Sequence, residues 1–322
     1  MSLSTLSWMI EGIQINPILA MRILHFSDLH VWNLRIVRDD LWYPKRWLGT
    51  VNLLARRRFK FPIELAHKVL DEIHRQESDL IVFSGDISTQ SIQEEFLHGS
   101  RLFEPLVHKW GDRFFVIPGN HDRYTPRSVQ RGYYENNFPY GSFGPDGKRV
   151  RVLRLKNKLA VVGFDCSIPY CMRSNGSFSK DLAEELDDIL EEQARVGHVV
   201  ILVGHFPYAL PEGVKDAWDH KLIGARLLAT IVRRHQPILY LHGHKHQRWC
   251  FVSPDTKKTV CINAGSAGMQ SSNPSRRAGY VSIELGENLR LERVHAHVAS
   301  CTRTELFQRL PLFANGGILP SP

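Results

Sequence analysis

The chain has few of the features that mark membrane-spanning, secreted or disulfide-rich proteins. Among its 322 residues no apolar run approaches the roughly 18–20 residues that a membrane-spanning helix needs. The first 20 residues lack a basic segment followed by an apolar one, so a secretory signal is not expected. The five cysteines are odd in number and lack metal-ligand spacing, which predicts reduced thiols in a cytoplasmic protein.

The composition is that of a globular protein with a basic surface. Hydrophobic residues make up 43% of the chain and charged residues 23%, which argues against disorder. The length allows one large α/β domain that buries most of its apolar surface. The formal net charge of +8 favours an acidic surface or an acidic substrate as the partner.

Five short polar motifs each lie at or just after an apolar run that is typical of a buried strand. They are Asp28-Leu29-His30, Gly85-Asp86, Gly119-Asn120-His121-Asp122, Gly204-His205 and Gly243-His244-Lys245-His246. The motifs supply Asp, Asn and His side chains and no Cys. This donor set suits Mn, Fe, Zn, Co or Mg rather than a metal that prefers thiolates.

Phosphoester hydrolysis explains why these residue types occur together. A negatively charged phosphoester repels a hydroxide nucleophile, and two cations about 3.5–4 Å apart overcome this by binding the attacking and leaving oxygens. Two such cations need a bridging ligand, and Asp86 is the natural candidate because it stands alone after a glycine. The neighbouring glycines allow the backbone to turn sharply next to the ions.

In this order and at these separations, the motifs resemble those of the calcineurin-like metallophosphoesterase superfamily, over about residues 21–298. The resemblance implies two divalent metal ions, manganese being the favoured one, which share Asp86. The ligands implied are Asp28, His30, Asp86 and His246 for one ion, and Asp86, Asn120, His205 and His244 for the other. It also implies that His121 is a catalytic acid acting on the leaving oxygen and that Asp122 supports the same loop.

The apolar patterns predict an α/β fold of mixed (α+β) type: two mixed β-sheets packed face to face with flanking helices, in four layers. We expect early strands at 22–27, 80–84, 114–117, 199–203 and 238–241, with hairpins at 150–164, 249–263 and 279–296. Helices are expected at 63–76, 92–110, 180–194 and 221–234, the second of them broken near Gly99 and Pro105. Residues 1–20 are expected to be an extension, 21–300 the domain and 301–322 a tail.

Residues 41–61, between the first two motifs, combine cations with apolar residues and contain no acid. From Pro44 onward, one helix face is expected to carry Trp47, Leu48, Val51 and Leu54. This composition is typical of a helix that lies in the interface of an anionic membrane. The alternatives are that the stripe packs on the domain, or that the segment binds nucleic acid.

The basic apolar insert beside a phosphoester site predicts a lipid-linked substrate. The combination resembles the UDP-2,3-diacylglucosamine pyrophosphohydrolases of lipid A synthesis, in particular the LpxG type, which implies a protein peripheral on the inner face of the cell membrane. Substrate phosphates or uridine are expected to meet Arg123, Arg56, Arg57 and Arg58. The alternatives are a soluble phosphodiesterase acting on cyclic nucleotides or nucleic acid, and a non-enzymatic scaffold of the same fold. Residues 170–178 are interpreted as a surface loop, with a substrate cap as the alternative.

Overall fold

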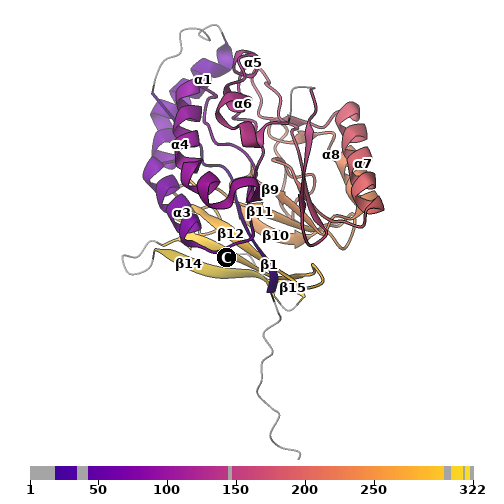
Figure 1. The fold of residues 1–322 in the computed structure, drawn as a ribbon. Coiled ribbons are helices and arrows are strands. Elements are labelled where there is room, and N and C mark those ends of the chain that lie inside the picture. The colour runs from indigo at the N-terminus through magenta and orange to yellow at the C-terminus, as the bar shows by residue number, and fades with distance from the viewer. Residues whose placement is uncertain (1–18, 35–42, 144–146, 301–305, 315, 320–322) are drawn as a thin grey trace, which may run out of the picture.

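The computed structural model describes residues 19–34, 43–143, 147–300, 306–314 and 316–319. Two large β-sheets pack face to face in the middle of the molecule, with helices on the outer face of each (Figure 1). This is the predicted four-layer arrangement of two mixed sheets and flanking helices.

The first sheet has seven strands in the order β15-β14-β13-β12-β1-β2-β3. β1 pairs with β2 in parallel and with β12 antiparallel, so the sheet is mixed. The bounds are β1 Leu19–Phe26, β2 Leu80–Phe83, β3 Phe114–Val116, β12 Gly279–Gly286, β13 Leu291–Ala299, β14 Phe307–Ala314 and β15 Gly317–Ile318. β1 thus begins three residues before the predicted strand, and β14 and β15 place two strands within the segment expected to be a tail.

The second sheet has six strands in the order β10-β11-β9-β7-β5-β4. Its strands are β4 Val150–Leu155, β5 Leu159–Phe164, β7 Val199–Val203, β9 Leu239–His242, β10 Arg248–Val252 and β11 Val260–Ala264. A small parallel pair, β6 Gly176–Ser177 and β8 Leu222–Ile223, joins two loops outside both sheets. The predicted hairpin around residue 157 is confirmed by the antiparallel pairing of β4 with β5.

Four long helices cover the two sheets: α3 Ile63–Arg75 and α4 Gln93–Trp110 on one side, α7 Lys180–Arg195 and α8 Ala225–His235 on the other (Figure 1). Shorter helices precede or connect them: α1 Pro44–Asn52, a π-helical turn over Leu53–Arg57, α2 Arg58–Lys60, α5 Pro126–Gln130 and α6 Tyr133–Asn137. Single 3-10 turns lie at Gly111–Arg113 and Pro139–Gly141. Within the described residues no helix is both long enough and apolar enough to span a bilayer.

Alternation along the strands builds separate cores on the two faces of each sheet. In β1, Ile23 points into the core between the sheets, whereas Leu24 and Phe26 point toward α3 and α4. β2 repeats this pattern because successive side chains of a strand face opposite sides. A third core, between the second sheet and α7 and α8, includes Leu186 and Val232.

Two helix predictions were wrong. α4 runs unbroken through Gly99 and Pro105. Pro105 lies on the exposed side of the helix, and its cost of about 3 kcal/mol is outweighed by buried neighbours such as Phe103 and Leu106. The helix expected to start at residue 221 starts at Ala225, because residues 222–223 form β8 instead.

The four cysteines within the described residues, Cys166, Cys171, Cys250 and Cys261, are free thiols. Three are buried and Cys171 is exposed. Cys301 lies outside the described residues.

Candidate metal centre

The five motifs meet at one edge of the two sheets. β1, β2 and β3 run parallel to one another, as do β5, β7 and β9. The loops that follow the carboxyl ends of β1, β2, β3, β7 and β9 carry the motif residues. Parallel strands deliver such loops to the same edge, which is where α/β sheets usually bind ligands.

Four of the predicted ligands form a tight group. Asp28, His30, Asp86 and His246 each offer one donor atom, and these atoms lie within 4.8 Å of one another. Nε2 of His246 is 2.8 Å from Nε2 of His30 and 3.1 Å from Oδ1 of Asp28. Nε2 of His30 is 3.7 Å from a carboxylate oxygen of each aspartate. Imidazoles and carboxylates that converge in this way are the donor set of a divalent metal site.

The other predicted ligands adjoin this group through Asp86. Oδ2 of Asp86 lies 3.3 Å from Nε2 of His205. Oδ1 of Asn120 lies 3.1 Å from the same nitrogen and 2.9 Å from Nδ1 of His244. Asp86 therefore stands between the two groups, as a bridging ligand must.

Two carboxylate oxygens support the fit to cations. Oδ1 of Asp28 and Oδ2 of Asp86 are buried and accept no hydrogen bond of good geometry from the described residues. A buried carboxylate oxygen in that state is costly unless a cation faces it. When bound, a pair of divalent cations supplies Lewis acidity and a water of lowered pKa for attack on phosphorus.

The protonation of the side chains is compatible with metal binding. Burial, followed by nearby positive charge, holds the pKa of His30 and His244 well below the ordinary histidine value. Burial also lowers the pKa of His205, but the Asp86 carboxylate outweighs it and raises this pKa to about 9. The two neutral imidazoles are ready ligands, and a cation has one proton to displace from the pair of Asp86 and His205.

The backbone is strained where it presents the donors. Five of the seven predicted ligands, none of them glycine, have positive φ angles: Asp28, His30, Asp86, His244 and His246. Such conformations cost about 1–3 kcal/mol each and cluster at functional sites. A Cβ on Gly119 would come within 2.5 Å of the backbone nitrogen of Asp86, so only glycine permits this approach of the two loops.

Asp122 organises the ligand loops and does not face the metal cluster. Its carboxylate accepts hydrogen bonds from the backbone nitrogens of Asp86, Ile87, Ser88 and Gly119 at 2.9–3.2 Å, and from Oγ of Ser88 at 3.0 Å. This ties the loop after β2 to the loop after β3. The supporting role that the family resemblance implies for Asp122 agrees with these contacts.

His121 contacts both the metal loops and the basic insert. Its backbone nitrogen donates to Oδ1 of Asp86 at 2.7 Å. Nδ1 is 2.6 Å from the carbonyl oxygen of Thr89, and the guanidinium of Arg57 lies 3.1 Å from Nδ1 and 3.0 Å from Nε2. Because a carbonyl oxygen only accepts and the Thr89 contact is the shorter one, we assign the ring proton to Nδ1, which leaves Nε2 to accept from Arg57. Burial, then the charge of Arg57, hold the pKa of His121 well below its ordinary value.

The insert lies over the metal centre with its basic side inward and its apolar side outward. Leu41 and Trp42, the first residues assigned to it, lie outside the described residues. The predicted apolar stripe is exposed: Trp47 by 55%, Leu48 by 55%, Val51 by 62% and Leu54 by 45%. The alternative in which this stripe packs on the domain is therefore wrong.

The inward side of the insert carries residues that the sequence analysis missed. Lys45 and Arg46 are buried, and Arg46 donates to the carbonyl oxygen of Gln90. Tyr124 stacks on His121 and donates to the carbonyl oxygen of Lys45. The sequence signal was present, since Lys45 and Arg46 lie opposite the apolar stripe, but which face of an amphipathic helix turns inward is decided by its neighbours.

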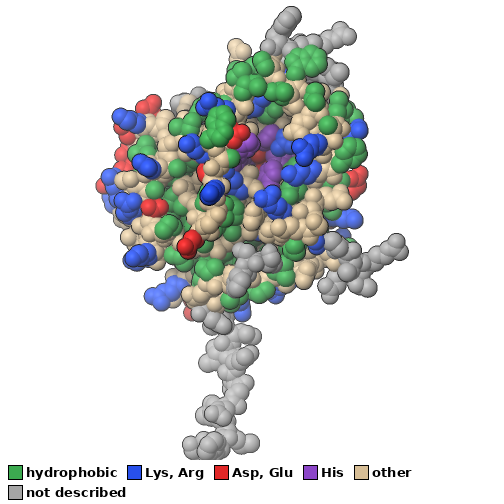
Figure 2. All heavy atoms as spheres, turned by 180° about the vertical axis from the view of Figure 1, so that it is seen from behind, with side chains coloured by type: hydrophobic (Ala, Val, Ile, Leu, Met, Phe, Trp, Pro, Cys, Tyr) green, Lys and Arg blue, Asp and Glu red, His purple; other side chains and the backbone are tan. Residues whose placement is uncertain are grey.

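A cavity of about 400 Å³ opens beside the metal centre. It is lined by Asn52, Arg56, Arg57, Lys60, Phe61, His121, Tyr124, Ser174, His220 and His246. Figure 2 shows histidines within an opening in this face, with Lys and Arg side chains on one side of it. The cavity therefore combines one predicted metal ligand, His246, with cations suited to phosphate.

Not all four arginines predicted to meet substrate line this cavity. Arg56 and Arg57 do, whereas the guanidinium of Arg58 lies 4.6 Å over the ring of Phe59. Arg123 is buried, binds Asp165 at 3.1 Å and Glu135 at 2.5 Å, and lines a separate cavity. These ion pairs hold Arg123 away from the metal centre, where its role is structural.

Two residues that follow the five motifs in the chain also contact the site loops. Ser266 donates to the carbonyl oxygen of Asp28 at 2.6 Å, and Asn263 donates to the carbonyl oxygen of Gly243 at 2.9 Å. His242 accepts from the indole of Trp249 at 3.3 Å.

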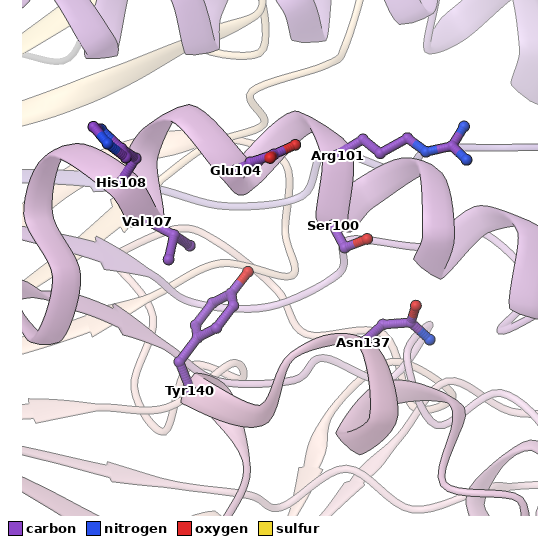
Figure 3. Close-up of a pocket in the computed structure, with 7 residues that line it drawn as sticks. All are labelled: Ser100, Arg101, Glu104, Val107, His108, Asn137 and Tyr140. Atoms are coloured by element: carbon purple, nitrogen blue, oxygen red, sulfur yellow. The ribbon is translucent and has the colours of Figure 1, made fainter.

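A further cavity of about 420 Å³ lies between α4 and residues 137–140, and none of the residues that line it belongs to the five motifs (Figure 3).

Comparisons with known proteins agree with this geometry. The model of a family described as calcineurin-like phosphoesterase matches residues 21–248. A probable glycerophosphodiester phosphodiesterase, GpdQ, from Arcobacter nitrofigilis is 26% identical over 178 residues, which cover 54% of this chain and 58% of that protein. This chain thus spans little more than half the length of that relative.

Solved structures show the same fold at low sequence identity. A dimetal phosphatase from Danio rerio has a TM-score of 0.54 at 12% identity, over 87% of this chain and 96% of that one. A purple acid phosphatase from yellow lupin has a TM-score of 0.52 at 11% identity, over 90% of this chain and 53% of that one. At this level of identity the likeness concerns the fold alone.

Proposed function

Because the chain belongs to the calcineurin-like phosphoesterase family and is a metal-dependent hydrolase, we propose that it cleaves the pyrophosphate of a nucleotide-linked lipid at a membrane surface. The substrate we propose is UDP-2,3-diacylglucosamine, and the products are the lipid 1-phosphate and UMP. The enzyme would then act in lipid A synthesis as an LpxG-type hydrolase on the inner face of the cell membrane.

One observation carries this proposal: an exposed apolar helix face adjoins a cationic cavity that opens on the metal centre. The outward stripe of Trp47, Leu48, Val51 and Leu54 belongs to the same insert that puts Arg56 and Arg57 into the cavity. A lipid-linked diphosphate has the matching division, with acyl chains at one end and charge at the other. Exposed Trp and Leu beside Arg and Lys are typical of an interfacial segment.

The roles we propose for the chain's residues follow from their contacts. Seven residues would hold the metals: Asp28, His30, Asp86, Asn120, His205, His244 and His246. Arg57, with Arg56 beside it, neutralises a phosphate oxygen and leaves Nε2 of His121 when it does so. Phosphate next to His121 then favours a second ring proton, which Nε2 gives to the leaving oxygen.

Manganese is the metal we propose, on the resemblance alone. The site offers imidazole, carboxylate and amide donors, and this mixture also accepts Fe, Zn, Co and Mg. Metal selection therefore depends on availability as much as on affinity.

The second candidate is a phosphodiesterase that acts on a soluble diester. The observation that favours it is the 26% identity to the probable glycerophosphodiester phosphodiesterase GpdQ. Cyclic nucleotides and nucleic acid remain alternative diesters, since the cavity is cationic. The complete set of metal donors argues against a scaffold that has lost its chemistry.

Parallel hydrolysis assays separate these candidates. Wild-type enzyme is first stripped with a chelator, then given Mn²⁺ and UDP-2,3-diacylglucosamine in detergent micelles. Parallel reactions contain glycerophosphocholine, a cyclic nucleotide and an aryl phosphodiester. We expect metal-dependent release of UMP that Asp86→Ala abolishes and that Gln308→Ala, an exposed change in β14, leaves intact.

Failure of the lipid reaction has a clear meaning in this design. Turnover of a soluble diester without release of UMP would overturn the lipid substrate and favour the second candidate. Release of UMP by metal-free protein would overturn the metal mechanism instead.

A further inference from the structure

We infer that a second exposed apolar site, across the cavity from the insert, binds the anionic bilayer that the insert binds. It consists of Met172 and Trp218, and we call it the second lip; the insert is the first lip. The inference deepens the proposed function and rests on its membrane location. It makes the membrane-binding surface a rim around the cavity and not a single helix.

Exposure sets these two side chains apart from ordinary loop residues. Met172 is 59% exposed and Trp218 is 64% exposed, as open to solvent as the stripe of the first lip. Large apolar side chains at such exposure, gathered around one opening, mark an interaction site rather than a folding requirement. Figure 2 shows hydrophobic side chains above the histidine opening and on one side of it.

The second lip borders the same cavity as the first. Ser174 and His220, each two residues from an exposed apolar residue of the second lip, line the cavity together with Asn52 and Arg56 of the first lip. The carbonyl oxygen of His220 accepts from Nε2 of His244, so this loop also touches the metal centre. A surface that meets both lips therefore covers the mouth of the site.

Specific bonds hold the second lip in shape. The guanidinium of Arg173 lies 4.8 Å over the ring of Trp218, and Nδ2 of Asn175 donates to the carbonyl oxygen of Trp218 at 3.1 Å. The pairing of β6 with β8 joins the two loops directly behind these residues. These contacts fix the conformation of the loop that exposes the indole of Trp218.

A buried lysine connects the two lips. Nζ of Lys45, on the inner side of α1, donates to the carbonyl oxygen of Arg173 at 2.9 Å. The same ammonium lies 4.4 Å from the centre of the Tyr124 ring. This bond joins α1 to the loop that carries Met172, so the two lips are linked to each other and can engage one surface together.

The charges around the rim favour an anionic bilayer as the occupant. The first lip contains no acidic residue between positions 43 and 61. In the loop that carries Trp218, Asp216 pairs with Lys245, and Asp219 lies 3.0 Å from Nδ1 of His220. Cations whose apolar neighbours reach outward bind lipid headgroups and the acyl boundary at the same time.

Vesicle binding of the full-length protein tests the inference. Sedimentation with vesicles of equal parts phosphatidylglycerol and phosphatidylcholine is measured for wild type, Trp47→Glu, and the double variant Met172→Glu/Trp218→Glu. The control is Val196→Glu, since Val196 is 50% exposed but lies just before β7, at the end of that strand away from the site. Hydrolysis of a soluble aryl phosphodiester confirms that each variant is folded.

We expect the double variant to partition at least about tenfold more weakly than wild type, because two large apolar side chains no longer enter the bilayer. Trp47→Glu should show a similar loss. The conservative variant Trp218→Phe, which keeps an apolar ring, should bind vesicles like wild type, and so should Val196→Glu. Vesicles of phosphatidylcholine alone should bind wild type more weakly than the anionic vesicles.

The contrary results are distinct. A double variant that binds like Val196→Glu overturns the second lip while leaving the first lip and the proposed function intact. A wild type that fails to bind either vesicle overturns the inference and points to a protein partner for the rim. Expected vesicle binding without cleavage of UDP-2,3-diacylglucosamine leaves the rim standing and rejects the proposed substrate.

Discussion

His121→Ala should separate chemistry from metal binding at this site. The structure predicts that the two are carried by different atoms of one residue. The ring of His121 contacts Thr89 and Arg57, whereas its backbone nitrogen donates to Oδ1 of Asp86 at 2.7 Å. Alanine keeps the backbone bond and removes the ring, so Asp86 should remain oriented for metal.

Loss of the His121 ring should lower both the rate of hydrolysis and the stability of the fold. Removal of a general acid typically lowers the rate by about 10²–10⁴-fold. The ring also makes one neutral hydrogen bond and one to a charged group, whose loss should reduce the free energy of unfolding by about 3 kcal/mol in total. Two bound metal ions should remain, with affinity close to that of wild type.

Metal content by elemental analysis, urea unfolding and single-turnover hydrolysis would check each of these values. His108→Ala is the matched control, because His108 lines the separate cavity in Figure 3 and contacts no motif residue. A variant that binds fewer than two metals, or one that keeps more than about a tenth of the wild-type rate, would refute this division of roles.

Two other changes test how the loops hold the site. Gly119→Ala should lower the metal affinity about 10–100-fold, because the alanine Cβ would collide with Asp86. Calorimetric titration with Mn²⁺ measures this affinity. The control is Gly317→Ala, where the nearest atom to the added Cβ is 4.0 Å away. Burial raises the pKa of Glu95 to about 7 from its usual 4.5, against the opposing effects of backbone donors and Arg46. The folded protein therefore holds this proton more tightly than the unfolded chain, and stability from this group is lost as pH rises from about 4.5 through 7. Relative to Glu95→Gln, wild type should lose about 2.5 kcal/mol of unfolding free energy between pH 5 and pH 8. Urea unfolding that shows the same difference at both pH values would contradict the assignment.

Local patterns were sufficient to predict most of the scaffold. Alternation in segments such as Leu80–Phe83 and the helical spacing in Ile63–Arg75 depend on neighbours within a few residues, and both elements formed as expected. The prediction failed at α4, where the helix was expected to break near Gly99 and Pro105. The helix tolerates Pro105 because its neighbours Phe103 and Leu106 are buried in a core whose other members, such as Phe26 and Phe83, lie far away in sequence.

The candidate site was predictable in its membership and not in its surroundings. The motif residues carry their own signal, since Asp, Asn and His recur after strands with glycine beside them. The contact of Arg57 with His121 spans 64 positions, and that of Lys45 with Arg173 spans 128. No local pattern specifies such a pairing.

The sequence by itself predicted which Asp, Asn and His side chains come together at one edge of the sheets, because each motif is written in a few consecutive residues after an apolar run. It also determined that the insert is basic and apolar. Only the tertiary structure decided that the apolar stripe faces outward, that Arg123 belongs to Asp165 and Glu135, and that Met172 and Trp218 stand beside the same opening. The physical reason is that the direction of a helix face and the partner of a buried charge depend on which surfaces the fold brings together.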